Sequence, residues 1–166
     1  MKKVLFITGL FFFVGNVLAD TDVNFKGTLI VDPCIVSTSS AEQTIEFGNI
    51  AASTFINHNR SAGERFKITL AECDLSLGST VSITFNGTAA GQQPDAFSVT
   101  GTAEGIGIAL EDAEGKTITP NVSLESSPLN AGETVLEYMA YVQGPDYKGI
   151  KQGSFVSQVT FTLAYE

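Results

Sequence analysis

Residues 153–166 read GSFVSQVTFTLAYE, and this stretch decides the fold class. Every second side chain shares one face, and all but one of these are apolar: Phe155, Ser157, Val159, Phe161, Leu163 and Tyr165. The other face is polar over most of its length: Ser154, Gln158, Thr160, Thr162 and Glu166. A period of two places one face of a β-strand on a core and the other in water. We therefore expect a half-buried strand here.

The same alternation recurs upstream, between short polar turns. The expected strands are QTIEFGNI (43–50), RFKITLAEC (65–73), STVSITFNG (79–87), AFSVTG (96–101), GIGIALED (105–112) and VLEYMAYVQG (135–144). Turn formers such as Asn86-Gly87 and Pro94-Asp95 separate them. This spacing predicts an all-β sandwich in one domain. The stretch 51–64 has the least clear pattern, and we expect a loop with a short helical turn.

The N-terminus carries the pattern of an export signal. Lys2 and Lys3 precede an apolar run from Val4 to Val14, and the small or medium residues Val17, Leu18 and Ala19 follow it. This order is typical of a secretory signal peptide. The apolar run is too short for a bilayer core, which needs about 20 residues. We expect residues 1–19 to be removed.

The exported chain is strongly acidic. Without Lys2 and Lys3 its formal charge is (9 − 2) − 18 = −11. Such a chain has no electrostatic reason to bind nucleic acid or an anionic membrane. A basic partner and a merely solvated acidic surface both fit this charge.

Catalytic and metal-binding patterns are weak. Cys34 and Cys73 both lie in the exported part, and an even count there favours one disulfide. Two cysteines and the only histidine, His58, do not supply the four ligands of a structural zinc site. His58 lies in the polar run INHNRSAGE, with no nucleophile motif around it. We expect no enzyme activity, no metal and no cofactor.

The exported N-terminal segment also alternates. In DTDVNFKGTLIVDPC (20–34), one face carries Val23, Phe25, Gly27 and Leu29. This segment lies outside the loop that a Cys34–Cys73 bridge would close. Both ends of the exported chain therefore have the pattern of strands.

Over this exported length the chain resembles pilin subunits of the chaperone–usher family. The resemblance rests on VNFKGTLI leading into Cys34, on IEFGNI, ITLAEC and GIGIALEDAEG, and on the C-terminal run. In that run Tyr165 is penultimate and Gly153 is fourteenth from the end, with alternating apolar residues between them.

The resemblance implies an incomplete immunoglobulin-like β-sandwich of six strands plus an N-terminal donor extension. A periplasmic chaperone would first lend a strand to the open groove. At the outer-membrane usher, the extension of the next subunit would replace that strand. The implied domains are a signal peptide (1–19), a donor extension (20–30) and a pilin domain (31–166).

The resemblance also implies residue roles. In the extension, Val23, Phe25 and Leu29 would insert into a neighbour, and Gly27 would lie where the groove floor comes too close for a side chain. The groove strand would carry Gly153, Phe155, Val159, Phe161, Leu163 and Tyr165. The Cys34–Cys73 bridge would tie the first strand to the second.

Other interpretations of the same residues stay open. Both terminal strands could belong to a complete fold, Gly27 could be a bulge, Gly153 a turn, and Tyr165 a cap on the core. The function predicted is a structural pilus subunit, exported through the periplasm to the cell surface, with other pilin subunits as partners. A minor or adaptor position is favoured because the extension is short. A receptor-binding subunit, a chain terminator and a secreted hydrolase are the alternatives, and the assembled fibre could still bind a host receptor.

Overall fold

The computed structural model describes residues 26–27 and 31–166. The predicted signal peptide and three of the four predicted donor residues, Val23, Phe25 and Leu29, lie outside these residues. Gly27 is exposed and belongs to no strand or helix. Residues Val31–Glu166 form one compact unit, which is the subject of the following paragraphs.

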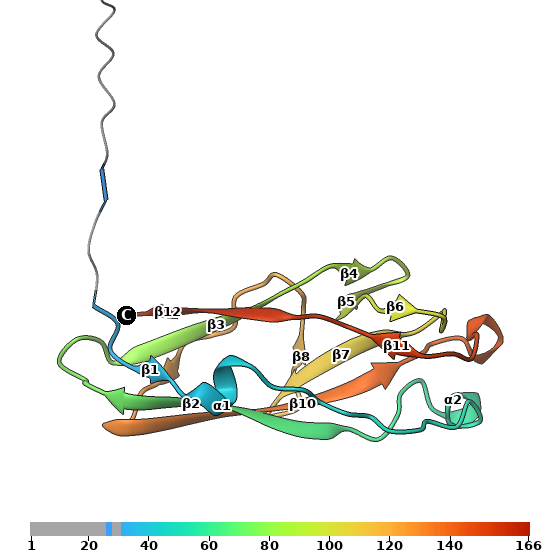
Figure 1. The fold of residues 1–166 in the computed structure, drawn as a ribbon, viewed down its shortest axis with the longest axis horizontal. Helices are drawn as coiled ribbons and strands as arrows, with labels where there is room; N and C mark the ends of the chain where they lie inside the picture. The colour runs from blue at the N-terminus through green and yellow to red at the C-terminus, as the bar shows by residue number, and fades with distance from the viewer. Residues whose placement is uncertain (1–25, 28–30) are drawn as a thin grey trace, which may run out of the picture. The chain divides into compact units, whose positions relative to one another are not determined.

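The regular secondary structure of the unit is mostly β-strand (Figure 1). The longer strands are β2 (Glu64–Cys73), β3 (Thr80–Asn86), β5 (Gln93–Phe97), β7 (Gly107–Asp112), β10 (Gly132–Gln143) and β12 (Thr160–Tyr165). Two-residue strands are β1 (Ile35–Val36), β4 (Ala89–Ala90), β6 (Thr100–Gly101), β8 (Thr117–Ile118), β9 (Ser127–Pro128) and β11 (Phe155–Val156). The helices are α1 (Thr38–Ala41), α2 (Thr54–Asn57) and the 3₁₀ turn η1 (Tyr147–Gly149).

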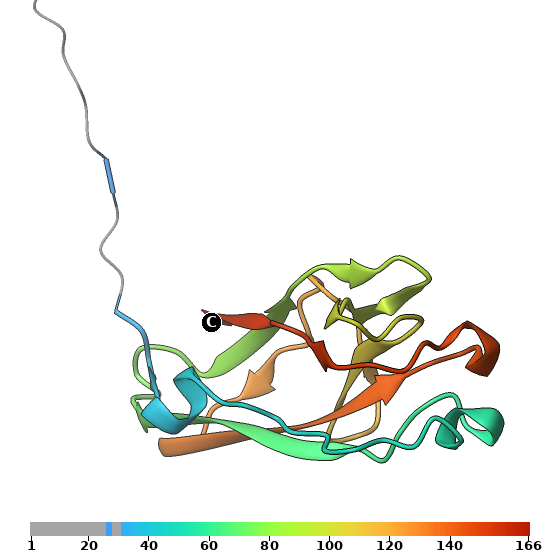
Figure 2. The ribbon, with the colours of Figure 1, turned by 45° about the vertical axis from the view of Figure 1, so that its right-hand side comes forward.

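These strands form two facing antiparallel layers. The larger sheet has the order β1-β2-β10-β7-β5-β4, with β8 paired to β7. The smaller sheet has the order β12-β3-β9, and β11 pairs separately with β6. Figures 1 and 2 show β12 and β3 lying over the layer that contains β2 and β10. The predicted β-sandwich is confirmed.

The core lies between the layers because the inward-facing positions of the strands are apolar. On β3 these are Val81, Ile83 and Phe85, each 2–3% exposed. They face Ile68 and Leu70 of β2, which are 1% and 0% exposed and belong to the same core cluster. Burying side chains of this size stabilises a fold by about 1.5–3 kcal/mol each.

An aromatic cluster connects the two layers. The rings of Phe85 and Tyr138 meet edge to face, with their centroids 5.0 Å apart. Phe66 lies 5.5 Å from Tyr138 and 6.2 Å from Phe85, measured between centroids. The three rings come from β3, β10 and β2, so they join the two layers.

The predicted disulfide is confirmed, because Cys34 and Cys73 are bonded to each other. Cys34 lies immediately before β1, and Cys73 is the last residue of β2. Both side chains are buried, at 4% and 6% exposure. The bridge therefore holds the short β1 against the end of its neighbour.

Three predicted strands differ from the structure. The predicted strand 96–101 is divided between the end of β5 and β6, because β5 pairs within the larger sheet and β6 pairs with β11. Residues 43–50 form no strand, although the expected alternation is present, with Ile45 and Phe47 half-buried between exposed neighbours. The C-terminal run is divided into β11 and β12 by residues 157–159, because β11 pairs with β6 and β12 pairs with β3. The predicted helical turn in 51–64 is confirmed as α2, whereas α1 has no counterpart in the expectations.

Candidate functional site: an open core face beside strand β12

Strand β12 lies at the edge of its sheet. It pairs with β3 in the register Phe161↔Phe85, Leu163↔Ile83 and Tyr165↔Val81. No strand of the described residues pairs with its other edge. Its outer backbone groups are therefore available to a further strand.

The core is incompletely covered along this edge. The inward-facing residues Phe161, Leu163 and Tyr165 pack on the core but stay half-buried. Their register partners on β3 are 2–3% exposed. Both strands present the same apolar face, so the difference arises from what lies beyond the edge. The uncovered inward-facing surface of Phe155, Val159, Phe161, Leu163 and Tyr165 is called the open core face below.

The segment after β1 lies on the other side of the open core face from β12. Phe47, in the extended stretch 42–50, packs against Phe155 of β11, with 6.2 Å between the ring centroids. Val36, Ile45 and Ile50 are also only partly buried against the core. Both views place this cyan segment and the red C-terminal run on the same side of the molecule (Figures 1 and 2). The stretch 43–50 therefore has the apolar pattern of a strand without a ladder partner among the described residues.

Side chains replace the missing strand ladder along this part of β2. The backbone N–H of Thr69 donates to Ser40 Oγ at 2.9 Å, and Gln43 Nε2 donates to the carbonyl of Lys67 at 3.1 Å. Ser40 is 3% exposed and is held by α1. Sequence reasoning missed these two residues, since an isolated serine or glutamine gives no periodic signal.

The two ends of the open core face differ. At the β11 end, a hollow of about 60 Å³ is lined mainly by apolar side chains, among them Phe55, Ile106, Ile150 and Phe155. At the other end, Glu166 O accepts hydrogen bonds from Ser79 N at 2.7 Å and Thr80 N at 3.0 Å, which hold the end of the chain against the start of β3. Burial and the nearby carboxylate of Asp32 raise the pKa of Tyr165, so its phenol stays neutral at physiological pH.

Gly153 lies outside the open core face. It precedes β11, where the chain passes close to Thr102 and Ala103, and Ser154 N donates to Thr102 Oγ1 at 3.0 Å. A Cβ at position 153 would lie 2.5 Å from Ala103 N. Close backbone approach is thus a sufficient reason for glycine here. The structure brings together the other five predicted groove residues and separates Gly153 from them.

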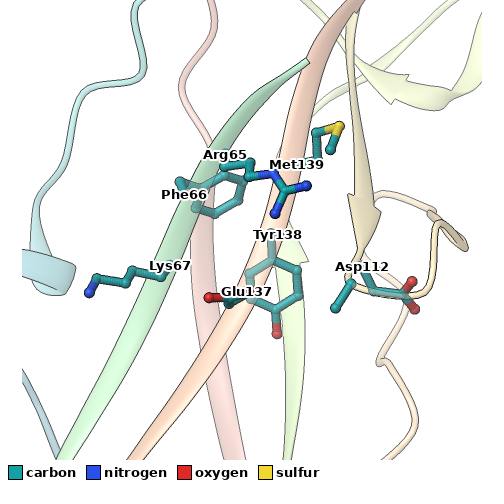
Figure 3. Close-up of a pocket in the computed structure, with 8 residues that line it drawn as sticks. Arg65, Phe66, Lys67, Asp112, Glu137, Tyr138 and Met139 are labelled. Carbon is teal, nitrogen blue, oxygen red and sulfur yellow. The ribbon is translucent and has the colours of Figure 1, made fainter.

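A second hollow, of about 300 Å³, is lined by residues of β2, β10 and the turn after β7 (Figure 3). Figure 3 shows Phe66 and Tyr138 between the charged side chains of Arg65, Lys67, Glu137 and Asp112. Lys67 is directly opposite Glu137 in the strand register. Burial raises the pKa of Tyr138 far above its ordinary value, so this phenol is no acid–base catalyst near neutral pH. The hollow has mixed surface charge, and its lining contains no serine, threonine, cysteine or histidine.

Within residues 26–27 and 31–166, no cluster of three or more His, Cys, Asp and Glu side chains could hold a metal ion. His58 follows α2 and is exposed, as predicted. The described helices are all too short to cross a bilayer.

The fold and the open core face define a class: an immunoglobulin-like β-sandwich with one uncovered edge. Residues 23–166 match the family model described as fimbrial protein. The chain therefore belongs to the fimbrial protein family, as a pilin of the chaperone–usher type.

Two fimbrial proteins are similar to this chain over its whole length. The chain is 34% identical to the Fimbria A protein of Serratia marcescens, covering 100% of this chain and 99% of that protein. It is 32% identical to the Long polar fimbria protein A of Salmonella typhimurium, covering 100% and 98%. The crystal structure of the P pilus rod subunit PapA superposes with a TM-score of 0.73 at 26% identity, covering 81% of this chain and 100% of that one.

Proposed function

We propose that this chain is a structural, non-enzymatic subunit of a surface fimbrium and polymerises by donor-strand exchange. One observation carries the proposal: Phe161, Leu163 and Tyr165 remain half-buried, while their partners on β3 are fully buried. A strand added to the outer edge of β12 would cover these side chains and pair with the free backbone groups.

The donor in this proposal is the segment 20–30 of another subunit. Its alternating residues Val23, Phe25 and Leu29 would insert between β12 and the segment 42–50. Gly27 would lie where the floor of the neighbour's groove comes too close for a side chain.

Before assembly, the open core face needs temporary cover. Several half-buried apolar side chains and an unpaired strand edge favour aggregation. A periplasmic chaperone would cover them by lending a strand, and an outer-membrane usher would exchange that strand for the extension of the next subunit. The route leads through the periplasm to the cell surface.

A synthetic peptide of residues 20–30 tests the donor. Added to the purified subunit that lacks its own residues 20–30, it should raise the melting temperature markedly, because it buries the open core face. The Gly27→Leu peptide has the same length and should stabilise far less. Equal stabilisation by both peptides would contradict the assigned register.

Deletion of 161–166 tests the acceptor. The shortened protein should lose chaperone binding and be degraded in the periplasm, whereas Ala164→Ser, an exposed change on the same strand, should not. Normal accumulation of the shortened protein would contradict the role of β12.

The position in the fibre is a separate question. The short extension favours the predicted minor or adaptor subunit. A second candidate, a repeating shaft subunit, is favoured by the similarity to a rod subunit over its full length. Quantitative mass spectrometry of isolated fimbriae distinguishes them: an adaptor occurs once or a few times in a fibre, and a shaft subunit is the main component. If the chain is instead a terminator, its groove should accept no donor peptide. If it is a receptor-binding subunit, it should bind host glycans directly.

A further inference from the structure

Two surfaces at opposite ends of the sandwich carry exposed apolar side chains. The C-terminal pole consists of residues 31–33, the loop 74–79 and Glu166. The η1 pole consists of α2 with His58 and of residues 146–150 around η1. Figures 1 and 2 place these poles at the two ends of the long axis.

The C-terminal pole is held together by short contacts. Asp74 N donates to Pro33 O at 2.8 Å, and Ser79 N donates to Glu166 O at 2.7 Å. Val31, Leu75 and Leu77 are 70%, 43% and 52% exposed on this surface. Residue 31 is also where the chain continues from the proposed donor extension, so a neighbour that receives the extension lies next to this pole.

The η1 pole joins two separate parts of the chain. Gly144 N donates to Asn59 O at 2.8 Å, and a Cβ at Gly144 would contact Phe55 of α2 and Ile150 beside η1. Ile56 and Tyr147 are 57% and 43% exposed here. The pole adjoins the 60 Å³ hollow at the β11 end of the open core face.

The C-terminal pole is acidic, whereas the η1 pole carries one acid and one base, so contact between unlike poles avoids placing carboxylates against carboxylates. The C-terminal pole carries the carboxylates of Asp32, Asp74 and Glu166, and its residues include no lysine or arginine. The η1 pole carries Lys148, which makes no ion pair within the described residues. Its acidic neighbour Asp146 accepts a hydrogen bond from the backbone N–H of Lys148 at 3.0 Å and so caps η1.

The direction of strand insertion decides which poles meet. Each extension leaves its own subunit at the C-terminal pole, next to the C-terminal end of β12. An incoming donor that ran parallel to β12 would leave the groove at this same pole and crowd the acceptor's own extension. An antiparallel donor leaves the groove at the η1 pole and keeps the other pole free, which permits an open-ended chain of subunits.

We propose that the C-terminal pole of each subunit docks on the η1 pole of the next copy, with Leu75 and Leu77 packed against Ile56 and Tyr147. This inference rests on the proposed function, because donor-strand exchange brings the two poles together. It adds a second contact, which limits bending at each junction. Such a heterologous contact repeats without closing, as a fibre requires.

Cysteine pairs test the contact in assembled fibres. The double variant Leu77→Cys with Tyr147→Cys, treated with a short bis-maleimide, should give a ladder of covalent multimers after denaturation. Each single variant should give none, and neither should Leu77→Cys with Val122→Cys, because Val122 is 52% exposed but lies between β8 and β9. The pair Leu75→Cys with Ile56→Cys is a second set in case the first variant fails to fold.

The outcomes separate this inference from the proposed function. Fibres that form normally but give no ladder with either pair would overturn the pole contact alone. A ladder from Leu77→Cys by itself would show like poles meeting and would overturn it as well. Failure of the 20–30 peptide to stabilise the subunit, together with the absence of fibres, would refute the proposed function and the contact with it.

Discussion

At the residue scale, several positions are fixed by contacts inside this chain rather than by the partner it would bind. Gly153 is the clearest example. The chain before β11 lies against Thr102 and Ala103, and Thr102 N donates to Ser154 O at 2.9 Å. A methyl group at Gly153 would have to displace backbone atoms.

Gly153→Ala should therefore destabilise the subunit by about 1–3 kcal/mol, the usual cost of overpacking a rigid site. Gly91→Ala is the matched control, because a Cβ there has no heavy atom within 4 Å. Urea denaturation of both variants, with the donor peptide bound, measures the difference. Equal midpoints for the two variants would contradict the packing role of Gly153.

A second residue-scale prediction concerns pH. Burial, with a smaller contribution from Asp112, raises the pKa of the Tyr138 phenol in the folded protein. The unfolded chain loses this proton near pH 10, so the free energy of unfolding should be unaffected below that pH and fall as the pH rises further.

Tyr138→Phe should flatten part of this alkaline decrease. Tyr141 and Tyr165, whose pKa values burial also raises, would leave the remaining slope. Urea midpoints between about pH 8 and pH 11.5 give the comparison. An unchanged slope in Tyr138→Phe would mean that this phenol ionises freely in the folded state.

At the element scale, β12 and β3 share a register but differ in burial. The inner side chains of β3 are covered by the facing sheet, and those of β12 are covered only in part. The uncovered part is the surface on which a donor strand would gain its hydrophobic free energy.

Leu163→Ser should weaken binding of the 20–30 peptide about tenfold or more, since about 1.4 kcal/mol of lost apolar burial corresponds to a factor of ten. Ala164→Ser, on the exposed face of β12, should bind normally. Isothermal titration calorimetry with the subunit lacking residues 20–30 provides both constants. Equal affinities would place the donor somewhere other than on this strand.

At the scale of the whole molecule, one covalent bond connects the start of the sandwich to its second strand. Cys34 and Cys73 are 39 positions apart, and the bridge holds the short β1, which makes only a two-residue ladder with β2. Closing a loop of this length lowers the entropy of the unfolded chain.

The double variant Cys34→Ser with Cys73→Ser should lose about 4 kcal/mol of stability in the loop-entropy model. Thermal unfolding of this variant should match that of the wild-type subunit in reductant. A large further loss in the variant would show that the serine hydroxyls, rather than the missing bond, destabilise the buried site.

The sequence by itself determined the class of fold and the faces of the strands. Alternating side chains specify which residues of β2, β3, β10 and β12 point to a core, because the period of a strand is two whatever its partner. The even number of cysteines, both after the predicted signal peptide, likewise predicted the bridge. Alternation does not specify which strands pair with each other. The alternating residues 43–50 are therefore predicted to be a strand, although they have no ladder partner among the described residues.

Only the tertiary structure decided what each apolar face touches. Phe85 and Phe161 belong to equally clear strands, yet one is fully buried and the other is not, because β3 lies inside its sheet and β12 at the edge. The same holds for Ser40. Its hydroxyl accepts a hydrogen bond from Thr69 N of β2 because the tertiary structure places α1 beside that strand. Burial depends on neighbours brought together from distant parts of the chain, and local periodicity carries no information about them.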